Sequence, residues 1–236
     1  MNDFKGKVAI VTGGTGGLGQ HVTRAFLQQG ATVVVPYREE TSFAALQEAL
    51  GELSQAVCGL QADLLEEPSV AKMVEEVVRR FRRIDVLVHL VGGFLGGVPV
   101  AETTLAQWEQ MMRLNVLSTF LCCRQVVPVM VRQGSGKIVT VGAQAGLQGR
   151  AKVAAYAAAK AAVLNFTQSL AAEVKKQHIN VNAVVPSTID TPANRAAMPD
   201  ADYSQWVSPQ SLAQVILFLA SDAARDIHGA IVPVFG

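Results

Sequence analysis

The sequence predicts an α/β protein of one domain, residues 1–236, with a doubly wound parallel sheet of about seven strands and helices on both faces. Short apolar runs rich in valine and isoleucine lack the alternation of half-exposed strands, which is typical of strands buried on both faces. These runs alternate with longer segments whose apolar residues recur at helical spacing. Such alternation favours right-handed crossovers and an open parallel sheet.

Each element has its own local signal. The run at 8–11 is apolar throughout, and the amphipathic segment after it stops at Gly30. Pro68 suits the first turn of a helix, and Ser208 with Pro209 suits the start of another. We expect strands at 8–11, 32–35, 56–60, 86–88, 138–141, 181–185 and 231–234, and helices from 18 to Gly30 and at 43–50, 68–81, 108–132, 155–176 and 209–220.

Composition excludes several classes of partner. With 20 basic and 19 acidic residues, the net charge of +1 gives no general attraction to nucleic acid or to an anionic membrane. The arginines within 79–83 could form a nucleic-acid patch, but cations at a helix end that complement the dipole are favoured. No apolar run reaches the ~18 residues of a membrane span, and no signal peptide is visible. Cys58, Cys122 and Cys123 favour reduced thiols in the cytoplasm, and no metal-ligand spacing is present.

A glycine-rich turn, TGGTGGLG at 12–19, connects the first strand to the first helix. Glycines allow a tight turn and let backbone N–H groups approach a pyrophosphate at the helix N-terminus. A Rossmann-type dinucleotide site is therefore predicted, with a ligand-free tight turn as the alternative. The residues expected to hold the cofactor here are Gly13, Thr15, Gly17, Leu18 and Gly19.

The spacing Gly13-xxx-Gly17-x-Gly19 resembles the TGxxxGxG signature of the short-chain dehydrogenase/reductase family, and length and element order match that family along the whole chain. The resemblance implies an NAD(P)-dependent oxidoreductase with a cofactor-binding half at about 1–135 and a catalytic and substrate half at about 136–236. It also implies a homodimer or homotetramer. The outer apolar positions expected to make that contact include Leu121, Val163 and Leu170.

The end of the second strand should lie beside the adenosine ribose. A carboxylate there would select NAD(H), whereas an arginine would pair with the 2′-phosphate of NADP(H). Tyr37 stands where the carboxylate is usual and Arg38 follows it, so NADP(H) is favoured; Glu39 and Glu40 would repel a phosphate and keep NAD(H) possible. The resemblance assigns further cofactor contacts to Asp63, Leu64, Gly92, Ile189 and Thr191. Asp63 could equally cap the helix that starts near Pro68.

Tyr156 and Lys160 are four residues apart on a strongly helical segment, so their side chains share one face. A phenol has an unperturbed pKa near ~10, and a neighbouring ammonium group together with the positive nicotinamide ring should lower the pKa of Tyr156. Tyr156 could then exchange a proton with a substrate as general acid or base. The resemblance implies that Lys160 also binds the nicotinamide ribose. It implies that Asn115 kinks its helix and holds a water in a proton relay to the lysine; a surface polar residue is the alternative.

The chain departs from the usual family pattern at Ala143, where a serine normally holds the substrate carbonyl oxygen. Loss of such a donor commonly costs ~10²–10³ in turnover, and the adjacent Gln144 could replace it. The Asn-Asn-Ala-Gly stretch after the fourth strand is also missing, and residues 89–97 read HLVGGFLGG instead.

These departures resemble the dihydropteridine reductase branch of the family, which is also similar at 189–206. That likeness implies a pterin-like quinonoid substrate, for which a carbonyl-holding serine is dispensable; an ordinary carbonyl compound is the other possibility. Phe94 and Trp206 could stack on a flat small-molecule substrate, with core or lid packing as the alternative for both. The branch carries an aspartate after its second strand and prefers NADH, unlike this chain.

Two functions are therefore weighed. The first is a reductase with Tyr156 as the proton donor. The second is a catalytically weak NAD(P)-binding sensor or interaction protein, motivated by Ala143. The retention of Asn115, Tyr156 and Lys160 favours the enzyme.

Overall fold

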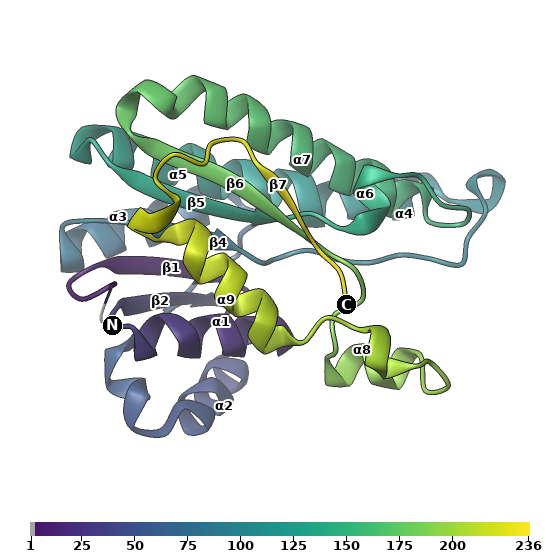
Figure 1. Ribbon diagram of the computed structural model, residues 1–236, viewed down its shortest axis with the longest axis horizontal. Coiled ribbons are helices and arrows are strands. Elements are labelled where there is room, and N and C mark those ends of the chain that lie inside the picture. The colour runs from purple at the N-terminus through teal and green to yellow at the C-terminus, as the bar shows by residue number, and fades with distance from the viewer. Residues whose placement is uncertain (1–2) are drawn as a thin grey trace.

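A computed structural model describes residues 3–236, and it confirms the predicted fold class. Seven parallel strands form one twisted sheet in the order β3-β2-β1-β4-β5-β6-β7 (Figure 1). The order reverses between β1 and β4, where ligands of open α/β sheets bind beyond the carboxyl ends of the strands. The strands are β1 (Val8–Thr12), β2 (Thr32–Tyr37), β3 (Val57–Gln61), β4 (Val86–His89), β5 (Gly136–Val141), β6 (Ile179–Pro186) and β7 (Ile231–Val234).

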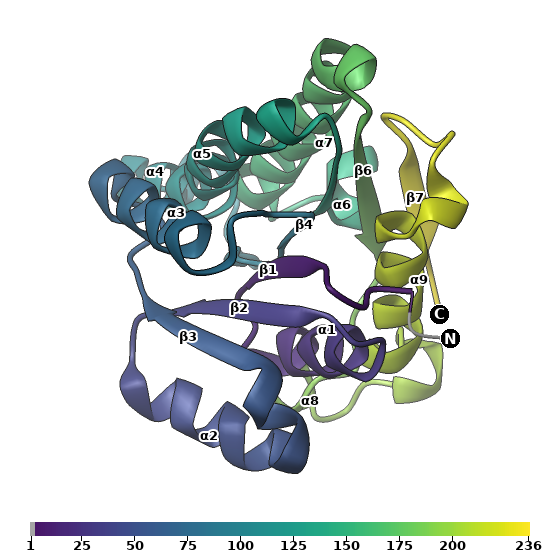
Figure 2. The ribbon, with the colours of Figure 1, turned by 90° about the vertical axis from the view of Figure 1, so that its left-hand side faces the viewer.

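Helices cover both faces of the sheet, as Figure 2 shows with the sheet between two layers. One layer holds α1 (Gly17–Gln28), α2 (Glu40–Leu50) and α9 (Pro209–Ala220), and the other holds α3 (Glu67–Phe81), α5 (Ser118–Gln133) and α7 (Ala154–Val174). Along β1, Ala9 and Val11 pack into the core under the first layer, while Val8 and Ile10 pack into the core under the second. Because both faces of this strand are buried, its sequence shows no alternation.

The long helix expected at 108–132 is helical along its whole length, but a π-helical turn separates two α-helices. It consists of α4 (Leu105–Met112), a π-helical turn (Arg113–Leu117) and α5. A π-helical turn widens the helix locally and is often found at functional sites. The kink that the family resemblance implies at Asn115 is therefore a π-helical turn. Two short helices, α6 (Gln144–Leu147) and α8 (Pro192–Ala197), complete the carboxyl edge of the sheet.

The segment Leu105–Gln133 is also long and apolar enough, by composition alone, to cross a bilayer. Half of its most apolar window is buried inside the protein, and Leu121, Cys122 and Val126 pack into the core beneath α3 and α7. The apolar character of this segment thus has a packing explanation within the fold.

The positions expected to form an oligomer contact are not on the surface, so this part of the prediction is wrong. Leu121, Val163 and Leu170 are buried, because these sides of α5 and α7 face the sheet. On the outer side of these helices lie Phe120 of α5, which is exposed, and Phe166 of α7, which is half-buried. The two rings pack edge to face, with 6.3 Å between the ring centroids.

Three of the four arginines at the end of α3 have acidic partners. Arg79 and Arg80 bond to Glu76, and Arg83 forms a bidentate pair with Asp85 at 2.6 and 2.7 Å. Asp85 is buried and also accepts the backbone N–H of Val8 at 2.8 Å. These pairs fit the interpretation of the cluster as a helix-end feature, because three of the arginines are engaged within the protein.

Candidate active site

The glycine-rich turn forms the bend that a pyrophosphate needs. Gly13 has a positive φ of 66°. A Cβ atom on Gly19 would lie 1.9 Å from the carbonyl oxygen of Gly13, so only glycine fits there. Helix α1 begins after Gly16 without a side-chain cap. Its first backbone N–H groups therefore remain available to an anion.

The loop after β6 lies directly against this turn. A Cβ atom on Gly17 would be 3.0 Å from Cγ2 of Thr191, so the two segments are in contact. Thr191 caps α8 through its hydroxyl, which accepts the N–H of Asn194 at 3.2 Å. The backbone carbonyl of Ile189 accepts the side-chain amide of Asn194 at 2.8 Å. The structure therefore brings the predicted cofactor residues Ile189 and Thr191 to the helix start at Gly17, as a shared dinucleotide site requires.

At the expected adenosine end, Tyr37 closes β2 and its ring stacks on Phe43 at 5.0 Å between centroids. The pKa of Tyr37 is raised, chiefly because its hydroxyl bonds to Glu40. Arg38 is exposed, and its backbone carbonyl accepts the side-chain amide of Gln61. Arg38 is thus an exposed guanidinium at the strand end, next to the exposed carboxylates of Glu39 and Glu40.

Asp63 follows β3, and its carboxylate accepts the N–H of Leu65 at 2.9 Å. The helix-cap alternative for Asp63 is wrong, since α3 begins at Glu67 after Glu66 and Asp63 stabilises the preceding turn. Asp63 is exposed and the neighbouring Leu64 is buried. Because Asp63 is exposed and its carboxylate has a second oxygen, the group can still accept a hydrogen bond from a ligand.

Tyr156 and Lys160 lie together on the first turns of α7, as their spacing predicts. The ammonium nitrogen of Lys160 is 6.0 Å from the centroid of the Tyr156 ring. It donates to the carbonyl of Val141 at 2.9 Å, which ties α7 to the end of β5. Only 7% of Lys160 is exposed. The pair is thus fixed at the carboxyl edge of the sheet.

The pKa values of the pair differ from the expectation. Burial raises the pKa of Tyr156 to about 12, and burial lowers the pKa of Lys160 to about 8. A lowered pKa of Tyr156 was expected from the lysine charge, but desolvation of the phenol dominates in the protein alone. The phenol is therefore fully protonated at neutral pH. That is the protonation state which a proton donor for a reduction needs.

Asn115 is buried in the π-helical turn, and the surface alternative for this residue is wrong. Its side-chain amide donates to the carbonyls of Gly93 at 3.1 Å and Met111 at 2.9 Å, and its oxygen accepts the N–H of Gly93 at 3.3 Å. A Cβ atom on Gly92 would lie 2.6 Å from Oδ1 of Asn115 and 3.2 Å from Nζ of Lys160. Gly92, Asn115 and Lys160 thus meet at one point.

Ala143 precedes α6 with an extended backbone and is buried, so its methyl group offers no hydrogen bond where the family serine is usual. The amide oxygen of Gln144 accepts a hydrogen bond from Arg150 at 2.7 Å. In the structure, Gln144 is therefore engaged with the loop before α7. This pairing could not be predicted from the sequence, because Arg150 lies in an irregular segment.

The two aromatic residues expected at the substrate site have different surroundings. Phe94 is 69% exposed, and its ring meets that of Tyr156 edge to face at 4.9 Å between centroids. Trp206 instead packs against Tyr203 at 4.7 Å in the segment that follows α8. Phe94 therefore borders the phenol directly, whereas Trp206 belongs to a separate cluster.

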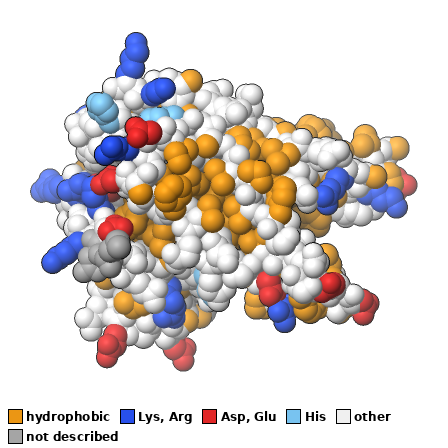
Figure 3. Space-filling view, viewed as in Figure 1, with side chains coloured by type: hydrophobic (Ala, Val, Ile, Leu, Met, Phe, Trp, Pro, Cys, Tyr) orange, Lys and Arg blue, Asp and Glu red, His pale blue; other side chains and the backbone are white. Residues whose placement is uncertain are grey.

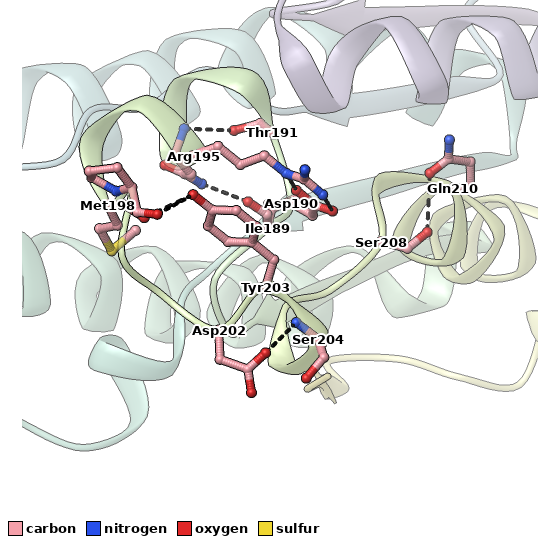
Figure 4. A network of polar contacts seen from close by, with 12 residues as sticks. Ile189, Asp190, Thr191, Arg195, Met198, Asp202, Tyr203, Ser204, Ser208 and Gln210 are labelled. Carbon is pink, nitrogen blue, oxygen red and sulfur yellow. Dashed lines mark hydrogen bonds and ion pairs between the residues drawn. The ribbon is translucent and has the colours of Figure 1, made fainter.

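That cluster has its own polar framework, shown in Figure 4. Arg195 pairs with Asp190 through two hydrogen bonds of 2.5 and 2.8 Å, and its guanidinium lies 4.5 Å from the centroid of the Tyr203 ring. The hydroxyl of Tyr203 donates to the carbonyl of Pro199 at 2.9 Å. The segment 189–206 is thus braced by its own side chains. The sequence of this segment resembles a family branch, but the ion pair between Arg195 and Asp190 could not be predicted from it.

One polar residue in the site region was not assigned a role from the sequence. His89 ends β4, is buried, and contacts Thr12 and Ser118 at 3.1 Å each. Burial, assisted by the charge of Lys160, lowers the pKa of His89 to about 3. Within residues 3–236, no group of three or more His, Cys, Asp or Glu side chains is placed to hold a metal ion.

The arrangement combines an anion-binding turn at the switch in strand order with a protonated phenol beside an amine. A nicotinamide dinucleotide fits the turn, because Gly19 leaves no room for a side chain and the start of α1 is uncapped. Fold and site together define the class of a dinucleotide-dependent oxidoreductase.

Comparison with known proteins also indicates an oxidoreductase. The family model described as short chain dehydrogenase matches residues 7–202. The chain is 31% identical over 241 residues to 3-oxoacyl-[acyl-carrier-protein] reductase FabG of Thermotoga maritima, covering 99% of this chain and 98% of the relative. It is 32% identical over 241 residues to cis-4-hydroxycyclohexanecarboxylate dehydrogenase of Sinomonas cyclohexanicum, covering 99% and 96%.

Solved structures are similar over nearly the whole chain. Levodione reductase superposes with a TM-score of 0.92 at 27% identity, covering 99% of this chain and 97% of the other. ElxO with NADP bound superposes with a TM-score of 0.92 at 25% identity, covering 97% and 96%. The protein belongs to the short-chain dehydrogenase family and is an oxidoreductase.

Proposed function

We propose that the protein is an NADP(H)-dependent reductase in which Tyr156 donates the proton that completes reduction of a small molecule. The observation that carries this proposal is the Tyr156 phenol beside Lys160, whose ammonium group is fixed at the carboxyl end of β5. The bound nicotinamide supplies the hydride. Gly13, Thr15, Gly17, Leu18 and Gly19 would hold its pyrophosphate, and Gly92, Ile189 and Thr191 would line the nicotinamide half.

In this proposal the chain's own residues move and position one proton. Tyr156 gives its hydroxyl proton to the substrate atom that gains charge, and the positive charge of Lys160 then stabilises the phenolate. Asn115 holds the Gly92–Gly93 loop through two hydrogen bonds with the backbone of Gly93, and a third bond to the carbonyl of Met111 anchors its own side chain. Reduction should therefore slow as pH rises through about 8, where Lys160 loses its charge.

The preference for NADP(H) is supported by the exposed position of Arg38 at the end of β2 and by the NADP bound to ElxO. We expect Arg38→Ala to weaken NADPH binding by about 10–100-fold, the effect of one charge-assisted hydrogen bond, and NADH binding by less than about twofold. Fluorescence titration with both cofactors measures this, with Arg150→Ala as the matched control on another loop. Equal losses for NADPH and NADH would show that Arg38 does not contact the 2′-phosphate.

For the substrate, we propose a flat quinonoid compound of the dihydropterin type. Three features support this choice: no hydroxyl stands at Ala143 to hold a carbonyl oxygen, Phe94 offers an exposed ring beside Tyr156, and segment 189–206 resembles the dihydropteridine reductase branch. A carbonyl substrate, as in the names of the relatives, is the second candidate. In that case Gln144 would have to leave Arg150 to act in place of the serine.

Ala143→Ser separates the two candidates. If the natural substrate is quinonoid, the added hydroxyl should leave quinonoid dihydropterin turnover within about twofold and raise turnover of simple diketones at least ~10-fold, in line with the worth of such a donor. The assay follows NADPH consumption by both variants with both substrates. An active wild type that reduces diketones well, and quinonoids poorly, would contradict the quinonoid assignment.

A cofactor-binding sensor or interaction protein is the second function, and Ala143 is the observation that favours it. The assay of NADPH consumption also distinguishes a sensor from a reductase. Tight NADPH binding without oxidation by quinonoid dihydropterin, diketones or quinones would identify the protein as a sensor.

We also propose a homodimer or homotetramer in the cytoplasm. Two separate apolar surfaces support the assembly: the Phe120–Phe166 pair on α5 and α7, and the face of α9 and β7, where hydrophobic side chains gather in Figure 3 and Phe218 and Phe235 are exposed. Two such surfaces suit a tetramer of dihedral symmetry. The three free cysteines suit a reducing compartment. Light scattering at micromolar concentration gives the oligomeric state, and a monomer would contradict this assignment.

A further inference from the structure

His89 lies between two parts of the site that come from different elements. On one side is Thr12, the last residue of β1 before the glycine-rich turn. On the other is Ser118, the first residue of α5 after the π-helical turn with Asn115. The imidazole touches both hydroxyls at 3.1 Å, through Nδ1 to Thr12 and through Nε2 to Ser118. All three side chains are buried.

The surrounding bonds determine the direction of each hydrogen bond. The hydroxyl of Ser118 donates its single proton to the carbonyl of Leu114 at 2.7 Å, so it must accept from Nε2 of His89. A neutral imidazole protonated at Nε2 has an acceptor at Nδ1, and the hydroxyl of Thr12 donates to it. Thr12 in turn accepts the backbone N–H of Leu90 at 3.1 Å. The hydrogen bonds therefore run in one direction from the N–H of Leu90 to the carbonyl of Leu114, and each donor along the way has an acceptor.

The imidazole is also held neutral. A second proton on His89 would lie in a buried site near the charge of Lys160, and it would face the hydroxyl of Thr12, which would then have to reverse its bond. A single tautomer therefore connects the backbone at Leu90 with the backbone at Leu114. Leu114 immediately precedes Asn115, and Leu90 precedes the Gly92–Gly93 loop that Asn115 binds.

We propose that His89 is a positioning residue which, in its Nε2-protonated form, ties the glycine-rich turn to the π-helical turn that carries Asn115. Its two bonds hold two different parts of the site. The bond to Thr12 holds the start of the glycine-rich turn against the end of β4, and the bond to Ser118 holds the end of the turn with Asn115 there. The effect on turnover rests on the proposed reductase function, whereas the tautomer does not.

The tautomer is tested first, on the wild-type protein labelled with ¹⁵N-histidine. The chain has four histidines, and His89→Gln assigns the signal that belongs to position 89. The expected signal is a neutral imidazole protonated at Nε2, unchanged between pH 5 and 8. An Nδ1-protonated ring, or a ring that titrates in this range, would overturn the proposal whether or not any substrate is found.

Two variants then test the two hydrogen bonds of His89 separately. Ser118→Ala removes the acceptor at Nε2 and should lower turnover about tenfold, a modest misplacement of reacting groups, with NADPH affinity within about twofold. Thr12→Val removes the donor at Nδ1 and should instead weaken NADPH binding about tenfold, since it loosens the cofactor turn. Thermal unfolding of each variant shows whether it still folds, so that a loss of turnover or affinity is not confused with a loss of structure.

A matched control is present in the chain. Thr167 is also a buried hydroxyl that donates to the carbonyl four residues earlier, Val163, at 2.8 Å, but it faces Thr140 rather than an imidazole. Thr167→Val should cost stability without separating turnover from affinity. Equal effects of Ser118→Ala and Thr167→Val on both quantities would show that Ser118 is merely structural and would overturn the positioning role of His89. If the tautomer is as expected and no substrate is turned over, the reductase function alone fails.

Discussion

Tyr156→Phe is expected to lower turnover by ~10²–10⁴ while NADPH affinity stays within about twofold, because the substitution removes the proton donor and keeps the ring. The Phe94 contact at 4.9 Å depends on the ring alone and should persist. Turnover is measured by NADPH consumption with quinonoid dihydropterin, and affinity by fluorescence titration.

The control for this variant is Tyr203→Phe, which also deletes a phenolic hydroxyl but one that binds the backbone of Pro199. We expect it to lose far less turnover than Tyr156→Phe. If Tyr156→Phe retained more than about a tenth of the wild-type turnover, proton donation by this phenol would be excluded.

Gly19→Ala is expected to abolish useful cofactor binding. The new Cβ atom would lie 1.9 Å from the carbonyl oxygen of Gly13 and 2.7 Å from Cα of Gly14, and both contacts are with backbone that cannot rotate away. The turn must open, so we expect the Kd for NADPH to rise at least ~100-fold, or about 2.7 kcal/mol. Overpacking should also lower stability by about 1–3 kcal/mol.

Gly149→Ala is the matched control, since its Cβ would have no atom within 4 Å. Titration calorimetry and thermal unfolding compare the two variants. Wild-type affinity in Gly19→Ala would show that the cofactor does not sit over this turn.

The fold was largely accessible from the sequence because its signals are local. Continuous apolar runs mark strands buried on both faces, and the pattern at 8–11 is explained by β1 packing into both cores. The Tyr156–Lys160 pair was found because helical geometry fixes which residues share a face. Both inferences need no knowledge of distant contacts.

What the sequence did not give depends on tertiary packing. The outward faces of α5 and α7 were misassigned because both sides of these helices carry apolar residues, and only the fold tells which side meets the sheet. In the protein alone the pKa of Tyr156 is raised because the phenol is buried, and sequence spacing does not reveal that burial. The links of His89, and of Gln144 with Arg150, join residues with no regular spacing.

The function that we propose is reduction with Tyr156 as the proton donor and with no hydroxyl at Ala143 to hold a carbonyl oxygen. The most direct measurement is the steady-state oxidation of NADPH by quinonoid dihydropterin, for the wild type beside Tyr156→Phe. We predict rapid oxidation by the wild type and a loss of at least ~100-fold in the variant. Oxidation at the same rate by both proteins, or none by a wild type that binds NADPH tightly, would contradict the account.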